Sequence, residues 1–257
     1  MITRLLDDEA DLRSLDWLRI ACGPITIVSL WPFVSDARNG HIYRDTFHEP
    51  YWSWFPELPR PLYIGLLWLG VLAALAMTLR LVPRLVNGIA FGVVAYNLLL
   101  STTHFHNNRT YLVVVLGCLA LAPVGRGPRW PLTLLRALVV CVYAGSGLSK
   151  LLDPDWFGGT VTWGRVLAVQ DRLPSWLAPT LTDRGFHAYA AKVVVLTELF
   201  IAFGLLWRRT RVAAVATAVV FHVAIALTAD VQVFSILGIA ALVIWFEPAT
   251  IEARLRR

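Results

Sequence analysis

Long apolar segments limit what this chain can fold into more than any other feature of its sequence. Hydrophobic residues make up 57% of its 257 residues, and the mean hydropathy is +0.62. Ordinary soluble domains are far less apolar. Several apolar windows approach the ~20 residues that a helix needs to cross a hydrocarbon layer ~30 Å thick. The sequence therefore predicts an all-α, multi-pass helical bundle in the cell membrane.

The apolar windows are separated by turns rich in proline, glycine and arginine, and they predict about eight transmembrane helices. These cover residues 15–34, 61–80, 84–103, 109–125, 130–151, 187–207, 211–229 and 231–246, within a few residues. The last window is short enough to tilt or to lie partly re-entrant. No internal repeat and no detachable soluble domain is recognisable. We therefore interpret residues 1–257 as a single transmembrane domain.

Arginines gather in the short turns "LRLVPR", "GRGPRW" and "RRTR". Basic residues collect in cytoplasmic loops of membrane proteins, so we place these turns and both termini in the cytoplasm. The long loops 35–60 and 152–186 then face outward. Both are rich in tryptophan and proline, which is typical of segments that are interfacial or re-entrant. The basic turns also explain the net charge of +6, so no nucleic-acid partner is predicted.

Polar residues collect in four clusters, and ionisable residues at membrane depth are functional candidates by default because their burial is costly. The clusters are residues 101–112 ("STTHFHNNRTYL", with His104, His106, Asn107, Asn108 and Arg109); Lys150 with Asp153 and Asp155; His222 with Asp230; and Lys192 with Glu198. The first three are expected in the outer half of the bilayer, on different helices. We therefore predict a shared polar cavity, and hence an active site, open to the outer leaflet.

The first cluster also has structural explanations. His104 and His106 are two residues apart, so on a helix they point apart, and no third ligand stands at metal-binding spacing. We predict no metal site. Asn107 and Asn108 could cap the following helix, with Arg109 reaching to the interface.

The other clusters have structural alternatives too. His222 could bond a neighbouring carbonyl group. Lys192 and Glu198 are six residues apart, too far for a pair on one face, and are interpreted as helix-packing residues. Lys150 is different, because only two of the 23 Lys and Arg residues are lysines. Arginine stays charged, whereas a lysine amine removed from water can release its proton and act as a base. Lys150 also follows "GSG", whose small residues allow close approach of a helix or ligand.

Several of these segments resemble a known family. "YAGSGLSKLLDPDWFGG" (143–159) resembles the lysine segment of vitamin K-dependent γ-glutamyl carboxylases and of their small bacterial relatives, the HTTM-domain proteins. "HNNRTYL" (106–112) is similar to that family's Asn-Asn-His-Ser-Tyr-Leu segment. "FHVAIALTADVQVFSILGIAALVIWF" (221–246) resembles its Phe-His span. "DWLRIACG" and "PYWSWFPELPRP" also fit, so the resemblance covers essentially the whole chain.

The resemblance implies a specific chemistry. In the carboxylases the matching lysine is taken as the base that deprotonates reduced vitamin K, whose anion then reacts with oxygen. Carried over, Lys150 would be the base, with His222 and Asn108 as supporting groups. Two departures limit the comparison. Arg109 stands where the carboxylases have a functionally important histidine, and nothing here could replace their large lumenal domain. Glutamate carboxylation is therefore not expected.

We predict an integral membrane enzyme that acts on a lipid-soluble isoprenoid, most simply a quinol, by Lys150-based deprotonation and O2-dependent epoxidation or oxidation. A second interpretation is an isoprenoid cyclase in which Asp153 or Asp155 donates the proton. A third is a non-catalytic helper for peptide toxin maturation or export. No tightly bound cofactor and no oligomeric state is predicted; reduced quinone and O2 would be co-substrates. The expected catalytic residues are Lys150, His222, Asp153 and Asp155, and the expected substrate-binding residues are His104, His106, Asn107, Asn108, Arg109, Tyr143, Trp156 and Asp230.

Overall fold

Helices make up nearly all of the regular structure, which confirms the predicted all-α class. The computed structural model describes residues 6–40, 49–228, 231 and 233–248. Within these ranges, the strands are β1 (Glu9–Asp11) and β2 (Arg126–Pro128), which pair antiparallel. The chain divides into two compact units, residues 1–135 with 232–257 and residues 136–231.

Five of the described helices are long and apolar enough to cross a membrane. They are α2 (Arg13–Asn39), α3 (Arg60–Thr78), α4 (Pro83–Leu100), α6 (Trp130–Leu152) and α10 (Arg184–Leu206). The other three predicted spans coincide with shorter apolar helices, namely α5 (Asn107–Leu121), α11 (Arg211–Thr228) and α12 (Phe234–Ala241) with the 3-10 turn η3 (Leu242–Trp245). At 1.5 Å per residue, the 15 residues of α5 extend ~22 Å. The helix positions are therefore confirmed, whereas the count of about eight full spans is not.

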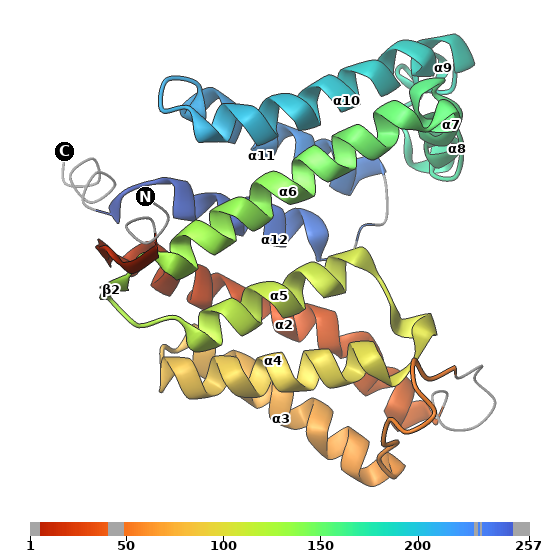
Figure 1. The fold of residues 1–257 in the computed structure, drawn as a ribbon. Coiled ribbons are helices and arrows are strands. Elements are labelled where there is room, and N and C mark those ends of the chain that lie inside the picture. Colours follow the sequence, from red (N-terminus) through yellow and green to blue (C-terminus); the bar gives the residue numbers. More distant parts are fainter. Residues whose placement is uncertain (1–5, 41–48, 229–230, 232, 249–257) are drawn as a thin grey trace. The chain divides into compact units, whose positions relative to one another are not determined.

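In the first unit, α2 packs against α3, α3 against α4, and α4 against α5, while α12 packs on α2 (Figure 1). Small residues let two of these helices approach closely. A Cβ atom on Gly23 would lie 2.1 Å from Thr78 Oγ1 and 2.6 Å from the carbonyl oxygen of Ala74. Only a glycine fits such a contact, so the backbone of α2 lies directly against α3.

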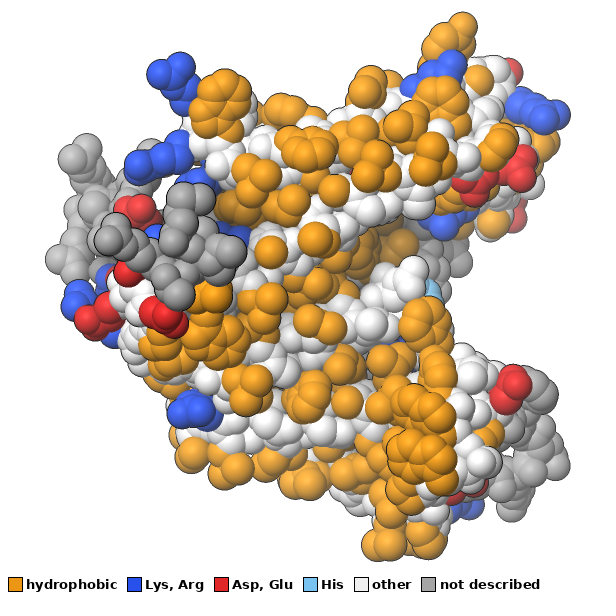
Figure 2. All heavy atoms as spheres, in the orientation of Figure 1, with side chains coloured by type: hydrophobic (Ala, Val, Ile, Leu, Met, Phe, Trp, Pro, Cys, Tyr) orange, Lys and Arg blue, Asp and Glu red, His pale blue; other side chains and the backbone are white. Residues whose placement is uncertain are grey.

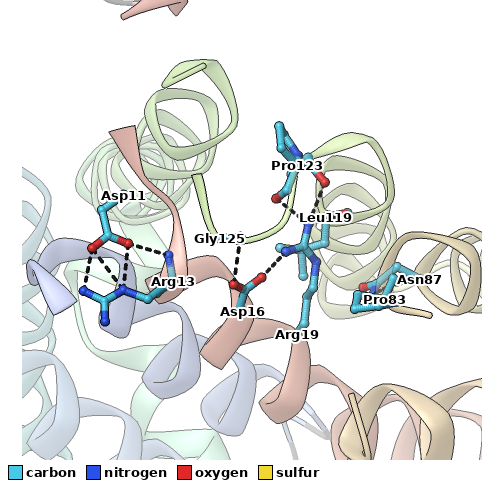
Figure 3. A network of polar contacts seen from close by, with 10 residues as sticks. Asp11, Arg13, Asp16, Arg19, Pro83, Asn87, Leu119, Pro123 and Gly125 are labelled. Atoms are coloured by element: carbon cyan, nitrogen blue, oxygen red, sulfur yellow. Dashed lines mark hydrogen bonds and ion pairs between the residues drawn. The ribbon is translucent and has the colours of Figure 1, made fainter. Parts of the chain in front are cut away.

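A polar network joins the start of α2 to the end of α5 (Figure 3). The buried Arg19 pairs with Asp16, and one of its guanidinium nitrogens donates to the carbonyl oxygens of Leu119, Ala122 and Pro123, at 2.9, 2.7 and 3.2 Å. Asp16 also accepts a 3.1 Å bond from the backbone N–H of Gly125. Sequence reasoning did not single out this network, because the backbone partners of Arg19 lie 100 or more residues further along the chain.

The second unit contains most of α6, together with α10 and α11, which pack on each other. The predicted outer loop between α6 and α10 folds into short helices: α7 (Pro154–Phe157), α8 (Thr160–Leu167), η2 (Gln170–Arg172) and α9 (Ala178–Leu181). They are tied down by the indole of Trp163, which donates to the carbonyl oxygen of Thr182 at 2.8 Å, and by His187, which bonds the carbonyl oxygen of Leu181 at 2.6 Å. The interfacial placement of this segment stays a prediction.

Large hydrophobic side chains are exposed along the helices, as expected where lipid replaces water. Examples are Leu72 on α3 and Val193 and Leu196 on α10, each about 60% exposed. Figure 2 shows hydrophobic side chains over the helix bodies, with Lys, Arg, Asp and Glu side chains gathered near the helix ends. These apolar helices fit a membrane protein. The cytoplasmic placement of the termini stays a prediction.

Candidate functional site

One face of α6 carries several of the polar residues that form the candidate site. Tyr143, Ser146, Gly147 and Lys150 stand at positions i, i+3, i+4 and i+7, so they follow one another along a single stripe. Their partners come from α10 and α11, which follow later in the chain. Helical spacing alone places these four residues on one face of α6. Which residues they contact depends on how the helices pack.

The centre of this stripe is an ion pair. Lys150 Nζ lies 2.8 Å from Oε1 and 2.8 Å from Oε2 of Glu198 on α10. Ser146 Oγ accepts a hydrogen bond from Lys150 and donates one of 2.9 Å to Glu198. The two ionised side chains are only 13% and 5% exposed. Because each is matched by an opposite charge and a hydroxyl group, the pair can be buried.

The ion pair corrects the interpretation of Glu198 as a helix-packing residue grouped with Lys192. Glu198 is the partner of Lys150, 48 residues away in the sequence. The ammonium of Lys192 instead lies near two aromatic rings, 5.5 Å from the ring centre of Phe157 and 5.7 Å from that of Tyr189. No local pattern could reveal the pair, because its members lie on different helices.

Gly147 allows α6 and α10 to come close enough for this contact. A Cβ atom at this position would lie 3.0 Å from Leu199 Cδ2 and 3.4 Å from Glu198 Cβ. A Cβ atom added to Gly145, two residues earlier, would have no neighbouring atom within 4 Å. The expected close helix approach at "GSG" is therefore present, and it belongs to Gly147.

A second polar contact lies further along the stripe. Tyr143 and Nε2 of His222 on α11 are 2.6 Å apart, and the two residues are 4% and 0% exposed. His222 thus bonds a side-chain hydroxyl here, whereas the structural alternative was a neighbouring carbonyl. Lys150 and Tyr143, which the sequence predicted as site residues, lie on the same stripe of α6, and His222 contacts Tyr143 there.

Trp156 covers the amine. Lys150 Nζ lies 4.9 Å from the centre of the Trp156 ring, and the guanidinium of Arg165 on α8 lies 4.9 Å from the same ring. Asp153 is the N-cap of α7, since its side chain accepts from the backbone N–H groups of Asp155 and Trp156 at 2.9 and 3.3 Å. Both aspartates are exposed. Asp153 therefore helps to place Trp156, and its side chain bonds the backbone of α7.

In the first unit, the histidine cluster lies where α4 ends and α5 begins. His104 ends the turn η1 (Thr102–His104), and its Nδ1 lies 2.8 Å from the carbonyl oxygen of Asn97. Arg109 donates to the carbonyl oxygen of His104 at 2.8 Å, and its guanidinium lies 4.4 Å from the ring centre of Phe33. Arg109 is thus held against α2, whereas the alternative was a side chain reaching to the interface.

The cap of α5 differs from the expected one. His106 is the N-cap, and its Nδ1 accepts a 3.3 Å bond from the backbone N–H of Asn108. Asn107 and Asn108 are the first two residues of the helix, so the expectation that they cap it is wrong. Histidine is an uncommon N-cap, which is why sequence reasoning chose the asparagines.

The remaining sequence predictions are not decided by these contacts. Asp230 lies outside the described residues, and the cavity predicted to join the clusters stays a prediction. Within the described ranges, no group of three His, Cys, Asp or Glu side chains could hold a metal ion.

Comparison with known proteins finds a domain family that matches the second half of the chain. Residues 123–249 match the HTTM domain, which is associated with vitamin K-dependent carboxylase-like membrane proteins. The match includes Lys150, Glu198 and His222, and it confirms the resemblance found in the sequence. No curated protein and no solved structure matches the chain.

Proposed function

We propose that this HTTM-domain chain is an integral membrane enzyme that removes a proton from a lipid-soluble isoprenoid substrate, most simply a quinol, at the Lys150–Glu198 pair. Its HTTM domain supports membership of a carboxylase-like class. The observation that carries the proposal is the buried contact of Lys150 with Glu198 and Ser146. A charged pair in an apolar helix bundle is costly to keep, which favours a functional role.

The pair has two protonation arrangements that differ by one proton transfer. In one, an ammonium faces a carboxylate; in the other, the proton has moved across the 2.8 Å contact and leaves a neutral amine beside a carboxylic acid. The neutral amine of Lys150 then accepts the proton of the quinol hydroxyl. The resulting ammonium lies beside the quinol anion and stabilises it, while Glu198 retains the other proton.

The quinol anion is then open to oxidation. The balanced overall reaction is quinol plus O2 giving quinone epoxide plus water, in which the quinol is oxidised and O2 is reduced. Trp156, 4.9 Å from the amine, supplies an apolar wall that keeps water away from the base. Tyr143 and His222 offer a hydrogen-bonded pair, 2.6 Å apart, that could take up the proton left on Glu198 before the next turnover.

The geometry favours this reaction over isoprenoid cyclisation by Asp153 or Asp155. A cyclase needs a protonated acid aimed at the substrate. Asp153 instead accepts two backbone N–H bonds, and both aspartates are exposed.

The test is quinone analysis by mass spectrometry on membranes given reduced menaquinone, with and without oxygen. Wild type and Lys192→Ala, the control that removes the other lysine, should form a quinone epoxide only with oxygen. Lys150→Ala and Glu198→Gln should form none above background. If no quinone changes in a Lys150-dependent way, the proposal is wrong. A lysine-dependent isoprenoid product formed without oxygen would support cyclisation, and preserved function in Lys150→Ala would support a non-catalytic role.

A further inference from the structure

A cavity of about 150 Å³ lies in the first unit, at the end where α2 begins and α3 ends. It is lined by polar residues Asp16, Arg19, Arg80 and Asn87 and by apolar residues such as Ile20 and Met77. The histidine cluster lies at the opposite ends of α4 and α5. None of the lining residues takes part in the proposed reaction.

The cavity lies close to a membrane surface. α3 and α4 both qualify as membrane spans, and only residues 79–82 separate them. Arg80 lies in this turn, and Asn87 is about one helical turn inside α4. Leu75 and Leu79 beside the cavity are 46% and 68% exposed, so acyl chains can lie along this part of α3. A ligand here would be at the level of lipid headgroups.

Two buried polar atoms of the lining residues have no hydrogen-bond partner. Arg19 is 3% exposed, and its Nε–H donor is unbonded although the rest of the guanidinium is engaged by Asp16 and by backbone carbonyls (Figure 3). Asn87 is 0% exposed, and its Nδ2 donates to the carbonyl oxygen of Pro83 at 2.6 Å, whereas its Oδ1 acceptor is unbonded. Buried polar groups are normally satisfied, so both atoms indicate a missing partner. That partner must both accept and donate.

The charge of the cavity favours an anion. The charge of Arg19 is balanced by Asp16, while Arg80 is exposed and has no ion pair among the described residues. Arg84, in the first turn of α4, adds a second positive charge that acts on Arg19. The lining therefore carries one cation more than its carboxylate can neutralise.

We propose that this cavity binds a phosphate ester that carries a free hydroxyl group, and that its source is the headgroup of an anionic phospholipid such as phosphatidylglycerol. The phosphate would accept from Arg19 Nε and from Arg80, and the hydroxyl would donate to Asn87 Oδ1. Basic pockets between membrane helices commonly bind anionic headgroups. Phosphatidylcholine fits poorly, because its quaternary ammonium has no N–H to donate and adds positive charge.

The experiment measures the thermal unfolding midpoint of the purified full chain in detergent, by tryptophan fluorescence. Short-chain phosphatidylglycerol, short-chain phosphatidylcholine and inorganic phosphate are titrated separately. Only phosphatidylglycerol should raise the midpoint, and the rise should saturate. A saturable rise with inorganic phosphate alone would support the phosphate site but overturn lipid as its source. No saturable rise, or an equal rise with phosphatidylcholine, would overturn the proposal.

Three variants locate the effect. Arg80→Gln and Asn87→Leu should each weaken the apparent affinity for phosphatidylglycerol on the order of tenfold, which is the loss of one charge-assisted or buried hydrogen bond. Arg208→Gln removes an equally exposed charge from the second unit and should leave the affinity unchanged. Arg80 is exposed, so Arg80→Gln should still fold even if Asn87→Leu does not. Wild-type affinity in Arg80→Gln would overturn the assignment of the site.

Discussion

The amine of Lys150 contacts both carboxylate oxygens of Glu198 at 2.8 Å, across two helices and 48 residues of sequence. This pairing makes the two side chains one functional unit. The amine is not simply a base in an apolar pocket, because its behaviour depends on the carboxylate. Substitutions at the two positions should therefore be strongly coupled.

Removing one charge of this pair should destabilise the protein more than removing both. Glu198→Gln leaves an uncompensated ammonium in a buried site, which costs about 3–5 kcal/mol. The double variant Lys150→Met with Glu198→Leu should recover most of that loss while remaining inactive. Chemical unfolding in detergent measures the effect. A double variant as unstable as Glu198→Gln would contradict the argument that the unpaired charge causes the loss.

Tyr143→Phe should lower the free energy of unfolding modestly, because it deletes the 2.6 Å bond to His222. A buried hydrogen bond contributes about 0.5–1.5 kcal/mol, and a buried ring nitrogen left without its partner adds to the cost. Tyr189→Phe is the control, since Tyr189 is 74% exposed and should be near neutral. Equal effects of the two substitutions would show that the Tyr143–His222 bond contributes nothing.

Gly147→Val should separate α6 from α10 and so lengthen the Lys150–Glu198 contact. Its Cβ would lie 3.0 Å from Leu199, and the added methyl groups need still more room. Overpacking of this kind costs about 1–3 kcal/mol. Gly145→Ala, whose Cβ meets no neighbour, should instead stabilise α6 by up to about 1 kcal/mol. We expect activity to fall with Gly147→Val only; if the two variants kept equal activity, close helix approach would not matter.

The contribution of Asp11 to stability should depend on pH. Hydrogen bonding to the Arg13 guanidinium holds the pKa of the Asp11 carboxyl below its usual 3.8. Because the folded pKa lies below the unfolded one, the stabilisation is present above the unfolded value and is lost as pH falls through the folded one. Both side chains are partly exposed, so the effect should be at the low end of about 0.2–1 kcal/mol.

The measurement is the difference in unfolding free energy between wild type and Asp11→Asn. That difference should be largest near neutral pH and should shrink as the pH falls below about 4. High salt should reduce it too, because the pair is near the surface. A difference that grows on acidification would contradict the sign of the shift.

The helices could be predicted from the sequence, and Lys150 could be singled out as unusual, because both leave local signals. Apolar windows mark the helices, and a rare lysine after "GSG" marks the site. Glu198 could not be identified as the partner, since the pairing depends on how α6 and α10 pack. The N-cap role of His106 was missed because histidine has no strong capping preference. The lengths of α5 and α12 were overestimated because apolar turns extend the hydropathy signal beyond the helix ends.

The Arg19 network has a consequence for how α5 fits into a bilayer. A helix that extends only ~22 Å is shorter than a hydrocarbon layer ~30 Å thick, and its last carbonyl groups have no partner within the helix itself. Arg19 reaches from α2 and supplies the missing donors to Leu119, Ala122 and Pro123. Its positive charge also interacts favourably with the negative, C-terminal end of the helix dipole. The guanidinium therefore acts as a cap supplied by a neighbouring helix, and it satisfies the end of a segment that is shorter than a full membrane span.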